Sequence, residues 1–303
     1  MGDYWVRAMT EDGTVRALAA VTTSAVEKAR RRHGTAPTAT AALGRTLTAA
    51  GLIGAMLKSG QSVTVRVLGD GPLGGVLATG DAAGSVRGYV ANPAVHLPLT
   101  PSRKLNVGGA VGRGTLHVTM DLGMRMPYHG SVPLVSGEIG EDLAAYFVQS
   151  QQTPSLVALG VLVSPDERVI ASGGLIVQLM PGADAHTTAY LEARAGVLPT
   201  ITSMVSAGRS PEEIVHSALG EVHTSIVARQ IVRFACRCSL TKVKGVLVSL
   251  GERELREIVE EQGHVEVRCN FCGRLYTLDE AEVDALIEEW GRKRERGTGN
   301  GEP

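Results

Sequence analysis

Cys236-Arg-Cys238 and, further along the chain, Cys269-Asn-Phe-Cys272 together contain every cysteine of this sequence. One Cys-X-Cys pair and one Cys-X-X-Cys pair, with no thiol left over, are typical of a tetrahedral Zn²⁺ site with four sulfur ligands. Cys236, Cys238, Cys269 and Cys272 are therefore the candidate ligands of one Zn²⁺ per chain. They predict a small zinc-binding domain near the C-terminus.

The second pair lies in a predicted hairpin. Residues 265–269 alternate like a short strand, Gly273 relieves the crowding after Cys272, and Leu275 and Tyr276 can return along the first strand. Such a knuckle directs two sulfurs toward one point. The first pair needs an extended or turned backbone, because residues two apart do not share a helix face.

The cysteines alone leave two interpretations open. Most four-cysteine zinc sites only hold a small domain together. Alternatively, the site is a thiol switch, because an oxidant that takes electrons from adjacent thiolates also ejects the metal and removes the folding free energy linked to it. Arginines flank the cysteines and favour the reactive thiolate form; they are Arg233, Arg237, Arg268 and Arg274.

Composition limits the other possibilities. The 303 residues suffice for two or three domains, and a formal net charge of −1 predicts neither nucleic-acid nor membrane binding. Residues 39–57 lean apolar but contain Arg45 and several threonines, so we expect a core helix rather than a membrane span. The start Met1-Gly-Asp-Tyr-Trp contains an acid and no apolar run, so no signal peptide is expected. Cysteines gathered in one cluster favour a reducing, cytoplasmic location.

Hydrophobic periodicity predicts an α+β core domain over residues 1–182, with a mainly antiparallel sheet and packed helices. Val63, Val65 and Val67 share one face of a strand, and further strands follow at short spacing. Two long apolar runs suggest central strands buried on both sides. The expected elements are a hairpin at 4–20, helices at 24–32, 39–57 and 141–149, and strands at 62–67, 85–90, 115–120, 156–163 and 168–179.

A glycine-rich run at 108–114 resembles a phosphate loop only superficially. It does not open a helix with GxGxxG, and the chain has no GxxxxGK[ST] motif. Turn glycines or a β-bulge are the better interpretation. The sequence therefore predicts no motif that binds a nucleotide cofactor.

The remaining chain is expected to form a helical linker at 183–232, a zinc-binding domain at 233–290 and a disordered tail at 291–303. In the linker, Ser210, Pro211 and Glu213 form a helix start and Gly220 a stop. Helices this short need a surface to lie on, so the linker is the part most easily released. In the zinc domain we expect two helices that each begin with a capping box, formed by Ser249 with Glu252 and by Thr277 with Glu280.

These features together resemble the heat-shock protein 33 family of redox-regulated holdase chaperones. The resemblance runs from about residue 5 to residue 290, and it departs from the family pattern at Gln151, where we expect glutamate. Besides the cysteines it is carried by Ala42-Leu-Gly-Arg45, Gly71-Pro72-Leu73, Gly84-Ser-Val-Arg-Gly-Tyr-Val90, Tyr128-His-Gly130, Ser136-Gly-Glu138, Tyr146-Phe147, Gly173-Gly174 with Gln178, and Met180-Pro181-Gly182.

The resemblance implies a chaperone that uses no ATP and performs no catalysis. Zn²⁺ on the four thiolates would keep it inactive. Oxidation would form the disulfides Cys236 to Cys238 and Cys269 to Cys272, release zinc, unfold the small domain and undock the linker. The active form, typically a homodimer, would then bind unfolding client proteins in the cytoplasm, with no membrane or nucleic acid involved.

Two other functions compete with this one. A nucleic-acid-binding protein with a structural zinc ribbon would use basic residues as phosphate contacts, namely Arg237, Lys242, Lys244, Arg268 and Arg274. The acids Glu257, Glu260 and Glu261 in the same domain oppose this alternative. A thiol oxidoreductase would use Cys269 and Cys272, but it needs them at a helix start in a βαβ unit.

Overall fold

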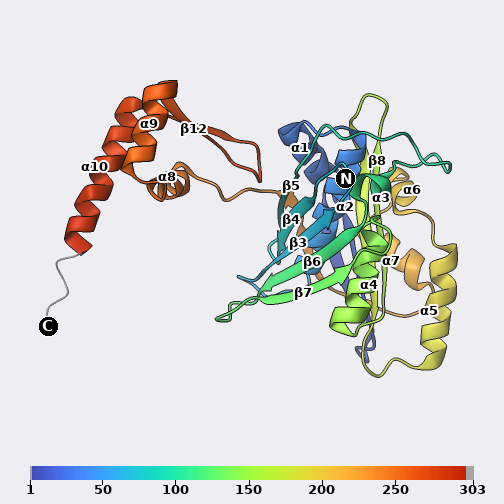
Figure 1. The fold of residues 1–303 in the computed structure, drawn as a ribbon. Coiled ribbons are helices and arrows are strands. Elements are labelled where there is room, and N and C mark those ends of the chain that lie inside the picture. The colour runs from blue at the N-terminus through green and yellow to red at the C-terminus, as the bar shows by residue number, and fades with distance from the viewer. Residues whose placement is uncertain (1, 298–303) are drawn as a thin grey trace, which may run out of the picture. The chain divides into compact units, whose positions relative to one another are not determined.

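The computed structural model describes residues 2–297, and the chain divides into two compact units between Ala235 and Cys236. The first unit holds two sheets and their helices, and the second holds a hairpin and three helices in its described part (Figure 1). The predicted α+β class with mainly antiparallel sheets is confirmed. The unit boundary lies slightly beyond residue 233, where we expected the zinc domain to begin, because Arg233–Phe234 (β11) pairs with a strand of the first unit.

One sheet of the first unit has five antiparallel strands. Their order is β10 (Ser225–Ile231), β1 (Tyr4–Met9), β2 (Val15–Val21), β9 (Val169–Leu179) and β8 (Ser155–Val163). The predicted N-terminal hairpin is β1 and β2, and the second hairpin is β8 and β9. Burial on both faces holds for β9 but is wrong for β8, which lies at the sheet edge and is mostly half-buried.

The other sheet has six strands. Their order is β11, β5 (Ser85–Val90), β4 (Val76–Asp81), β3 (Ser62–Gly69), β6 (Gly114–Asp121) and β7 (Tyr128–Pro133). Only the pairing of β11 with β5 is parallel. Val63, Val65 and Val67 are fully buried, which confirms the predicted alternation along β3.

The helix α2 (Pro37–Gly54) runs between the two sheets and contacts strands of both. Apart from Arg45, every residue from Thr38 to Gly54 is buried, including four threonines, as expected for a core helix enclosed between two sheets. A Cβ on Gly80 of β4 would lie 2.1 Å from the carbonyl oxygen of Ala50, so the glycine lets strand and helix meet backbone to backbone. The other helices of this layer are α1 (Thr23–His33), α3 (Val107–Val111) and α4 (Gly140–Gln151).

The glycine-rich run at 108–114 packs closely on its surroundings. A Cβ on Gly114 would lie 1.9 Å from the carbonyl oxygen of Leu68, and one on Gly108 would lie 2.6 Å from that of Ser136. Asn106 accepts a hydrogen bond from the Gly109 N–H and thereby caps the short α3. Gly108 and Gly109 lie inside α3, so the prediction of turn glycines or a β-bulge is wrong for these two, although glycines of this run do allow close backbone packing.

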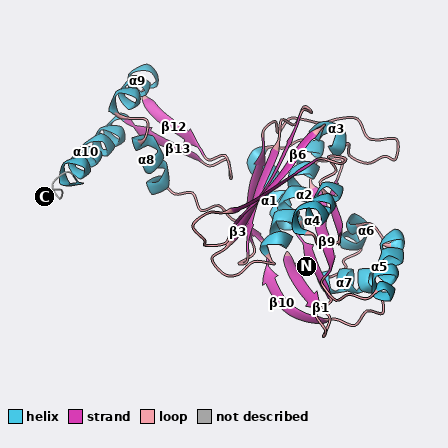
Figure 2. Cartoon of the chain, turned by 60° about the horizontal axis from the view of Figure 1, so that its bottom comes forward, coloured by secondary structure: helices cyan, strands magenta, loops and turns pink. Residues whose placement is uncertain are grey.

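Three short helices follow the core and lie against the five-stranded sheet (Figure 2). They are α5 (Ala185–Val197), α6 (Ile201–Ser206) and α7 (Pro211–Leu219). The predicted start of α7 is confirmed, because Ser210 and Glu213 form a reciprocal capping box, and Gly220 ends the helix at φ 59°. The prediction that residues 183–232 are helical throughout is wrong for their last part, which forms β10 and pairs with β1.

The second unit has its own small core around the hairpin β12 (His264–Arg268) and β13 (Leu275–Asp279). Its helices are α8 (Leu240–Val248), α9 (Glu252–Gln262) and α10 (Glu280–Gly297). Helix α8 was not predicted from the sequence. The buried residues are Val243, Leu247, Leu255, Val265, Leu278, Val283, Leu286 and Ile287.

Both predicted helix starts in this unit were misplaced. Ser249 is the C-cap of α8, and Gly251 precedes α9 with no side-chain cap. Thr277 lies within β13, and the reciprocal hydrogen bonds at the start of α10 join Asp279 and Glu282 instead. A capping motif in sequence does not show which of two neighbouring elements its residues belong to.

The last helix continues past residue 290 to Gly297, so the tail predicted to be disordered at 291–303 is helical as far as the structure describes it. Residues 298–303 lie outside the described part. Within that part, no helix combines the length and the apolar character needed to cross a membrane.

Candidate metal centre

The four predicted ligands come together in the second unit. The Sγ atoms of Cys236, Cys238, Cys269 and Cys272 all lie within 4.8 Å of one another. Cys236 Sγ is 3.7 Å from Cys269 Sγ, and Cys238 Sγ is 3.4 Å from Cys272 Sγ. Each sulfur of the first pair thus contacts a sulfur of the second, and the arrangement could hold one metal ion.

The knuckle forms as predicted and fixes the second pair. The N–H of Cys269 donates to the carbonyl of Arg274, and the N–H groups of Cys272 and Gly273 both donate to the carbonyl of Cys269. Gly273 has φ +67°, a conformation that a side chain would oppose. This tight turn after β12 directs both sulfurs of the pair to the same side.

The thiols differ in acidity because their hydrogen bonds differ. Burial raises the pKa of Cys238, but the hydrogen bond from Tyr276 and contacts with the neighbouring sulfurs outweigh it, and the pKa falls to about 7. Burial raises the pKa of Cys272 to about 12 and also raises that of Cys269. Four negative sulfurs this close repel one another, so a fully deprotonated set calls for a cation among them.

Tyr276, expected only as part of the return strand, is also a site residue. Its hydroxyl donates to Cys238 Sγ at 3.1 Å. Arg274 hydrogen-bonds to Tyr276 and lies near enough to Cys238 and Cys272 for their charges to raise the pKa of its guanidinium. Of the flanking arginines, Arg233 belongs to the first unit. The sequence places Tyr276 on the return strand of the knuckle, but no local pattern marks it as a partner of Cys238, which lies 38 residues earlier.

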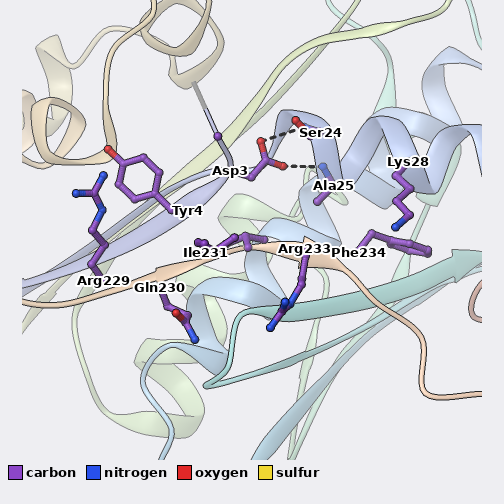
Figure 3. Close-up of a pocket in the computed structure, with 12 residues that line it drawn as sticks. Asp3, Tyr4, Ser24, Ala25, Lys28, Arg229, Gln230, Ile231, Arg233 and Phe234 are labelled. Carbon is purple, nitrogen blue, oxygen red and sulfur yellow. Dashed lines mark hydrogen bonds between the residues drawn. The ribbon is translucent and has the colours of Figure 1, made fainter.

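A cavity of about 700 Å³ in the first unit is a second place where polar groups gather (Figure 3). The buried carboxylate of Asp3 accepts hydrogen bonds from the N–H groups of Ser24 and Ala25 and so occupies the start of α1. The guanidinium of Arg229 stacks 4.1 Å above the ring of Tyr4. Asp3 and Arg229 are therefore both engaged in contacts with neighbouring elements.

Comparison with known proteins decides the family. The family model described as Hsp33 protein matches residues 3–279. The chain belongs to the Hsp33 family. Among curated Hsp33 relatives, the 33 kDa chaperonin of Desulforamulus reducens is 47% identical over 288 residues, covering 95% of this chain and 98% of that protein. The 33 kDa chaperonin of Halalkalibacterium halodurans is 47% identical over 290 residues, covering 95% of this chain and all of that protein.

A solved structure supports the same assignment. The crystal structure of the 33 kDa chaperonin from Thermotoga maritima, an Hsp33 homologue, matches with a TM-score of 0.90 and 34% identity. It covers 96% of this chain and 100% of that chain. The resemblance inferred from the cysteine pairs and the short motifs is therefore confirmed as Hsp33 membership.

Proposed function

We propose that the protein is a redox-regulated, ATP-independent holdase chaperone and not an enzyme. Cys236, Cys238, Cys269 and Cys272 would bind one Zn²⁺ in the reduced, inactive form. The observation that carries the proposal is that all four thiols converge in the small second unit. In the first unit of the same chain, the short helices α5–α7 cover an apolar sheet face. Family membership and the relatives' name, 33 kDa chaperonin, support it.

The sulfur positions suit zinc. A tetrahedral Zn²⁺ with Zn–S distances of about 2.3 Å separates its sulfurs by about 3.8 Å. The distances of 3.7 Å and 3.4 Å between sulfurs of the two pairs are close to that value. When bound, Zn²⁺ would keep the four thiols deprotonated and cross-link the start of the unit to its knuckle. Because the unit's own hydrophobic core is small, much of its folding free energy would depend on the metal.

Oxidation would remove this support. In each disulfide two thiolates lose two electrons, and hydrogen peroxide accepts these electrons with two protons to become two molecules of water. All four sulfurs lie within 4.8 Å of one another, so the folded arrangement leaves every pairing open. We propose the pairing of neighbours, Cys236 with Cys238 and Cys269 with Cys272, from the family resemblance. Neither disulfide can then supply the thiolate ligands that zinc requires.

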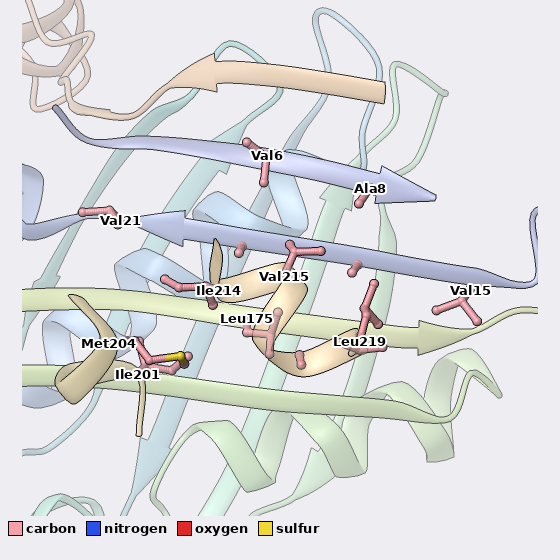
Figure 4. Packing of buried hydrophobic residues seen from close by; sticks show 14 of the residues in the cluster. Val6, Ala8, Val15, Val21, Leu175, Ile201, Met204, Ile214, Val215 and Leu219 are labelled. Carbon is pink, nitrogen blue, oxygen red and sulfur yellow. The ribbon is translucent and has the colours of Figure 1, made fainter. Parts of the chain in front are cut away.

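The surface to be released is the interface between α5–α7 and the five-stranded sheet. Figure 4 shows Ile201, Met204, Ile214, Val215 and Leu219 packed on this sheet face. Undocking these helices would expose apolar residues on both sides, which is the kind of surface that unfolded proteins bind. On the sheet side they are Tyr4, Val6, Ala8, Val15, Ala17, Ala19, Val21, Leu175 and Val177.

The helix α5 is held weakly. Leu191 is its only buried residue, and a cavity of about 330 Å³ remains beside it, lined by Leu156 and Val177 among others. Its polar anchors are Arg194, which donates to the carbonyl of Ser217, and Tyr190, whose hydroxyl accepts from the N–H of Glu221. Both partners lie at or just beyond the end of α7. Release of α7 would therefore release α5 with it.

Location and assembly complete the proposal. Four cysteines gathered at one site suit a reducing compartment, and we propose the cytoplasm. We also propose, from the family resemblance, that the active form is a homodimer. Clients would be unfolding proteins of no particular sequence, because an apolar sheet face offers shape and hydrophobicity rather than specific polar contacts.

The test measures zinc content, free thiols and aggregation of a heat-unfolding client on one preparation. The reduced protein should hold one zinc per chain and leave the client unprotected. Peroxide at mildly elevated temperature should release zinc as thiols disappear, and only this sample should keep the client soluble. Re-reduction with added zinc is the matched control and should abolish protection. Zinc that resists oxidant, or zinc loss without protection, would reduce the site to a structural one.

A further inference from the structure

Groups outside the cluster act on its sulfurs. The backbone N–H groups of Phe271 and Arg274 lower the pKa values of Cys269 and Cys272, although burial raises them. These two donors belong to the knuckle backbone, so any sequence that forms the turn supplies them. Cys238 instead accepts from a side chain, the hydroxyl of Tyr276, at 3.1 Å.

Tyr276 is held firmly enough to aim this hydroxyl. Its backbone lies on β13 opposite Val267, and its ring packs against the buried core of the second unit. Arg274, two residues earlier, lies close enough to the Tyr276 phenol for their interaction to raise the pKa of its guanidinium. A guanidinium can only donate, so beside the phenol oxygen it leaves the phenolic proton for sulfur.

The hydrogen bond links the two cysteine pairs. Tyr276 follows the second pair in sequence, whereas its acceptor Cys238 belongs to the first. A donor to sulfur draws electron density from the lone pair that attacks electrophiles, so it lowers the nucleophilicity of that sulfur. Partners of this kind around metal ligands typically change affinity or activity by 10- to 100-fold.

We propose that Tyr276 is a positioning residue that acts through Cys238: its hydroxyl protects the Cys238 sulfur from oxidants and other electrophiles. This inference rests on the proposed zinc-thiolate site, and it assigns to one side chain the control of one cysteine's reactivity.

The test compares Tyr276→Phe with Thr277→Val in the full-length, reduced, zinc-loaded protein. Tyr276→Phe removes the hydroxyl and keeps the ring, whereas Thr277→Val removes an exposed hydroxyl on the opposite face of the same strand. Iodoacetamide is the probe: sulfur forms a bond to its carbon and iodide leaves. Peptide mass spectrometry gives the alkylation rate of each cysteine.

Tyr276→Phe should raise the rate at Cys238 by about tenfold. The rates at Cys269 and Cys272 should stay within about twofold, because backbone N–H groups still protect these two sulfurs. Thr277→Val should change none of them. An unchanged rate at Cys238 would overturn the proposal. So would an equal rise at all four cysteines or the loss of zinc from the variant, because each of these shows a merely structural role.

A second readout is independent of alkylation. With Co²⁺ in place of zinc, the sulfur-to-metal charge-transfer absorption should move to lower energy in Tyr276→Phe, because the freed sulfur is a better electron donor. An unmoved absorption would contradict the proposal. Zinc analysis of the wild type distinguishes failure of the proposed zinc site from failure of the Tyr276 proposal. A wild type without zinc refutes the metal site itself. A zinc-loaded wild type in which Tyr276→Phe has no effect refutes only the role of Tyr276.

Discussion

The phenol of Tyr4 on β1 donates a 2.6 Å hydrogen bond to the carboxylate of Glu212 on α7, across 208 residues of sequence. Arg229 of β10 stacks on the same Tyr4 ring and pairs with the same carboxylate at 3.8 Å. Burial together with the bond to Glu212 raises the pKa of Tyr4 to about 12, so the phenol stays a donor throughout the physiological range. These contacts fasten the N-terminal end of α7 to the sheet.

Replacing Tyr4 with Phe should therefore loosen α7. The lost hydrogen bond to a charged, partly exposed partner is worth about 1 kcal/mol. Hydrogen exchange of residues 211–219 should be faster in the reduced variant than in the reduced wild type, and client protection should appear at lower peroxide doses. Tyr128→Phe is the matched control, because its hydroxyl lies 3.1 Å from Ser150 Oγ, remote from α7 in sequence and on another sheet. Equal exchange in wild type and Tyr4→Phe would show that this contact does not hold the helix.

Removing the metal should unfold the second unit and leave the sheets of the first unit folded. The two tryptophans report them separately, because Trp5 is buried in β1 and Trp290 lies on α10. In a Trp5→Phe variant, a zinc chelator should shift the Trp290 emission to longer wavelength as its surroundings become wet. In a Trp290→Phe variant, the Trp5 emission should not move. An unaltered Trp290 signal after complete zinc removal would mean that the second unit folds without metal.

Gly80→Ala should destabilise the first unit without affecting zinc binding. Its Cβ would lie 2.1 Å from the Ala50 carbonyl, and neither backbone can move without shifting α2 between its two sheets. Overpacking of this kind costs about 1–3 kcal/mol. Urea unfolding followed by Trp5 fluorescence gives the loss. Gly196→Ala is the control, because a Cβ there meets nothing within 4 Å, and its unfolding midpoint should not fall.

Glu27 should make the stability of the first unit pH-dependent. The hydrogen bond from Arg30 lowers its pKa, burial opposes this, and the N–H of Val169 on β9 lowers it further. A depressed pKa means that this stabilisation is complete above about pH 5, near the unfolded pKa, and disappears as the pH falls through the folded one. Glu27→Gln should cost less than about 1 kcal/mol at pH 7.

Urea unfolding of both proteins from pH 7 to pH 3 checks this dependence. The gap between wild type and Glu27→Gln in the free energy of unfolding should close as the pH decreases. Urea is preferred to guanidinium, because a salt would screen the ion pair. A gap that persists at pH 3 would show that the charge of Glu27 is not what stabilises the contact.

Much of this structure could be predicted from local pattern. The period-two valines gave β3, and the spacing of the four cysteines predicted that their sulfurs meet. Both signals are strong because strand periodicity and metal coordination constrain residues that lie close in sequence. The capping box at Ser210 and Glu213 was predictable for the same reason.

The wrong predictions concern elements whose structure depends on contacts with segments far away in the sequence. Residues 225–231 became a strand because β1, over 200 residues earlier, offers an edge to pair with. The edge position of β8 likewise depends on where the five-stranded sheet stops. Neither the bond from Tyr276 to Cys238 nor that from Tyr4 to Glu212 has a local sequence signal, since each depends on how two separate elements are brought together.

If oxidation of the four cysteines frees α5–α7 from the five-stranded sheet, the release is visible by hydrogen exchange with mass spectrometry. The reduced zinc-loaded protein is compared with the same protein after peroxide treatment. Residues 185–219 should lose their protection on oxidation while β2 and β9 keep theirs, and reduction with zinc should restore the first pattern. Persistent protection of residues 185–219 in a protein that has lost its zinc and its thiols would show that oxidation does not free these helices.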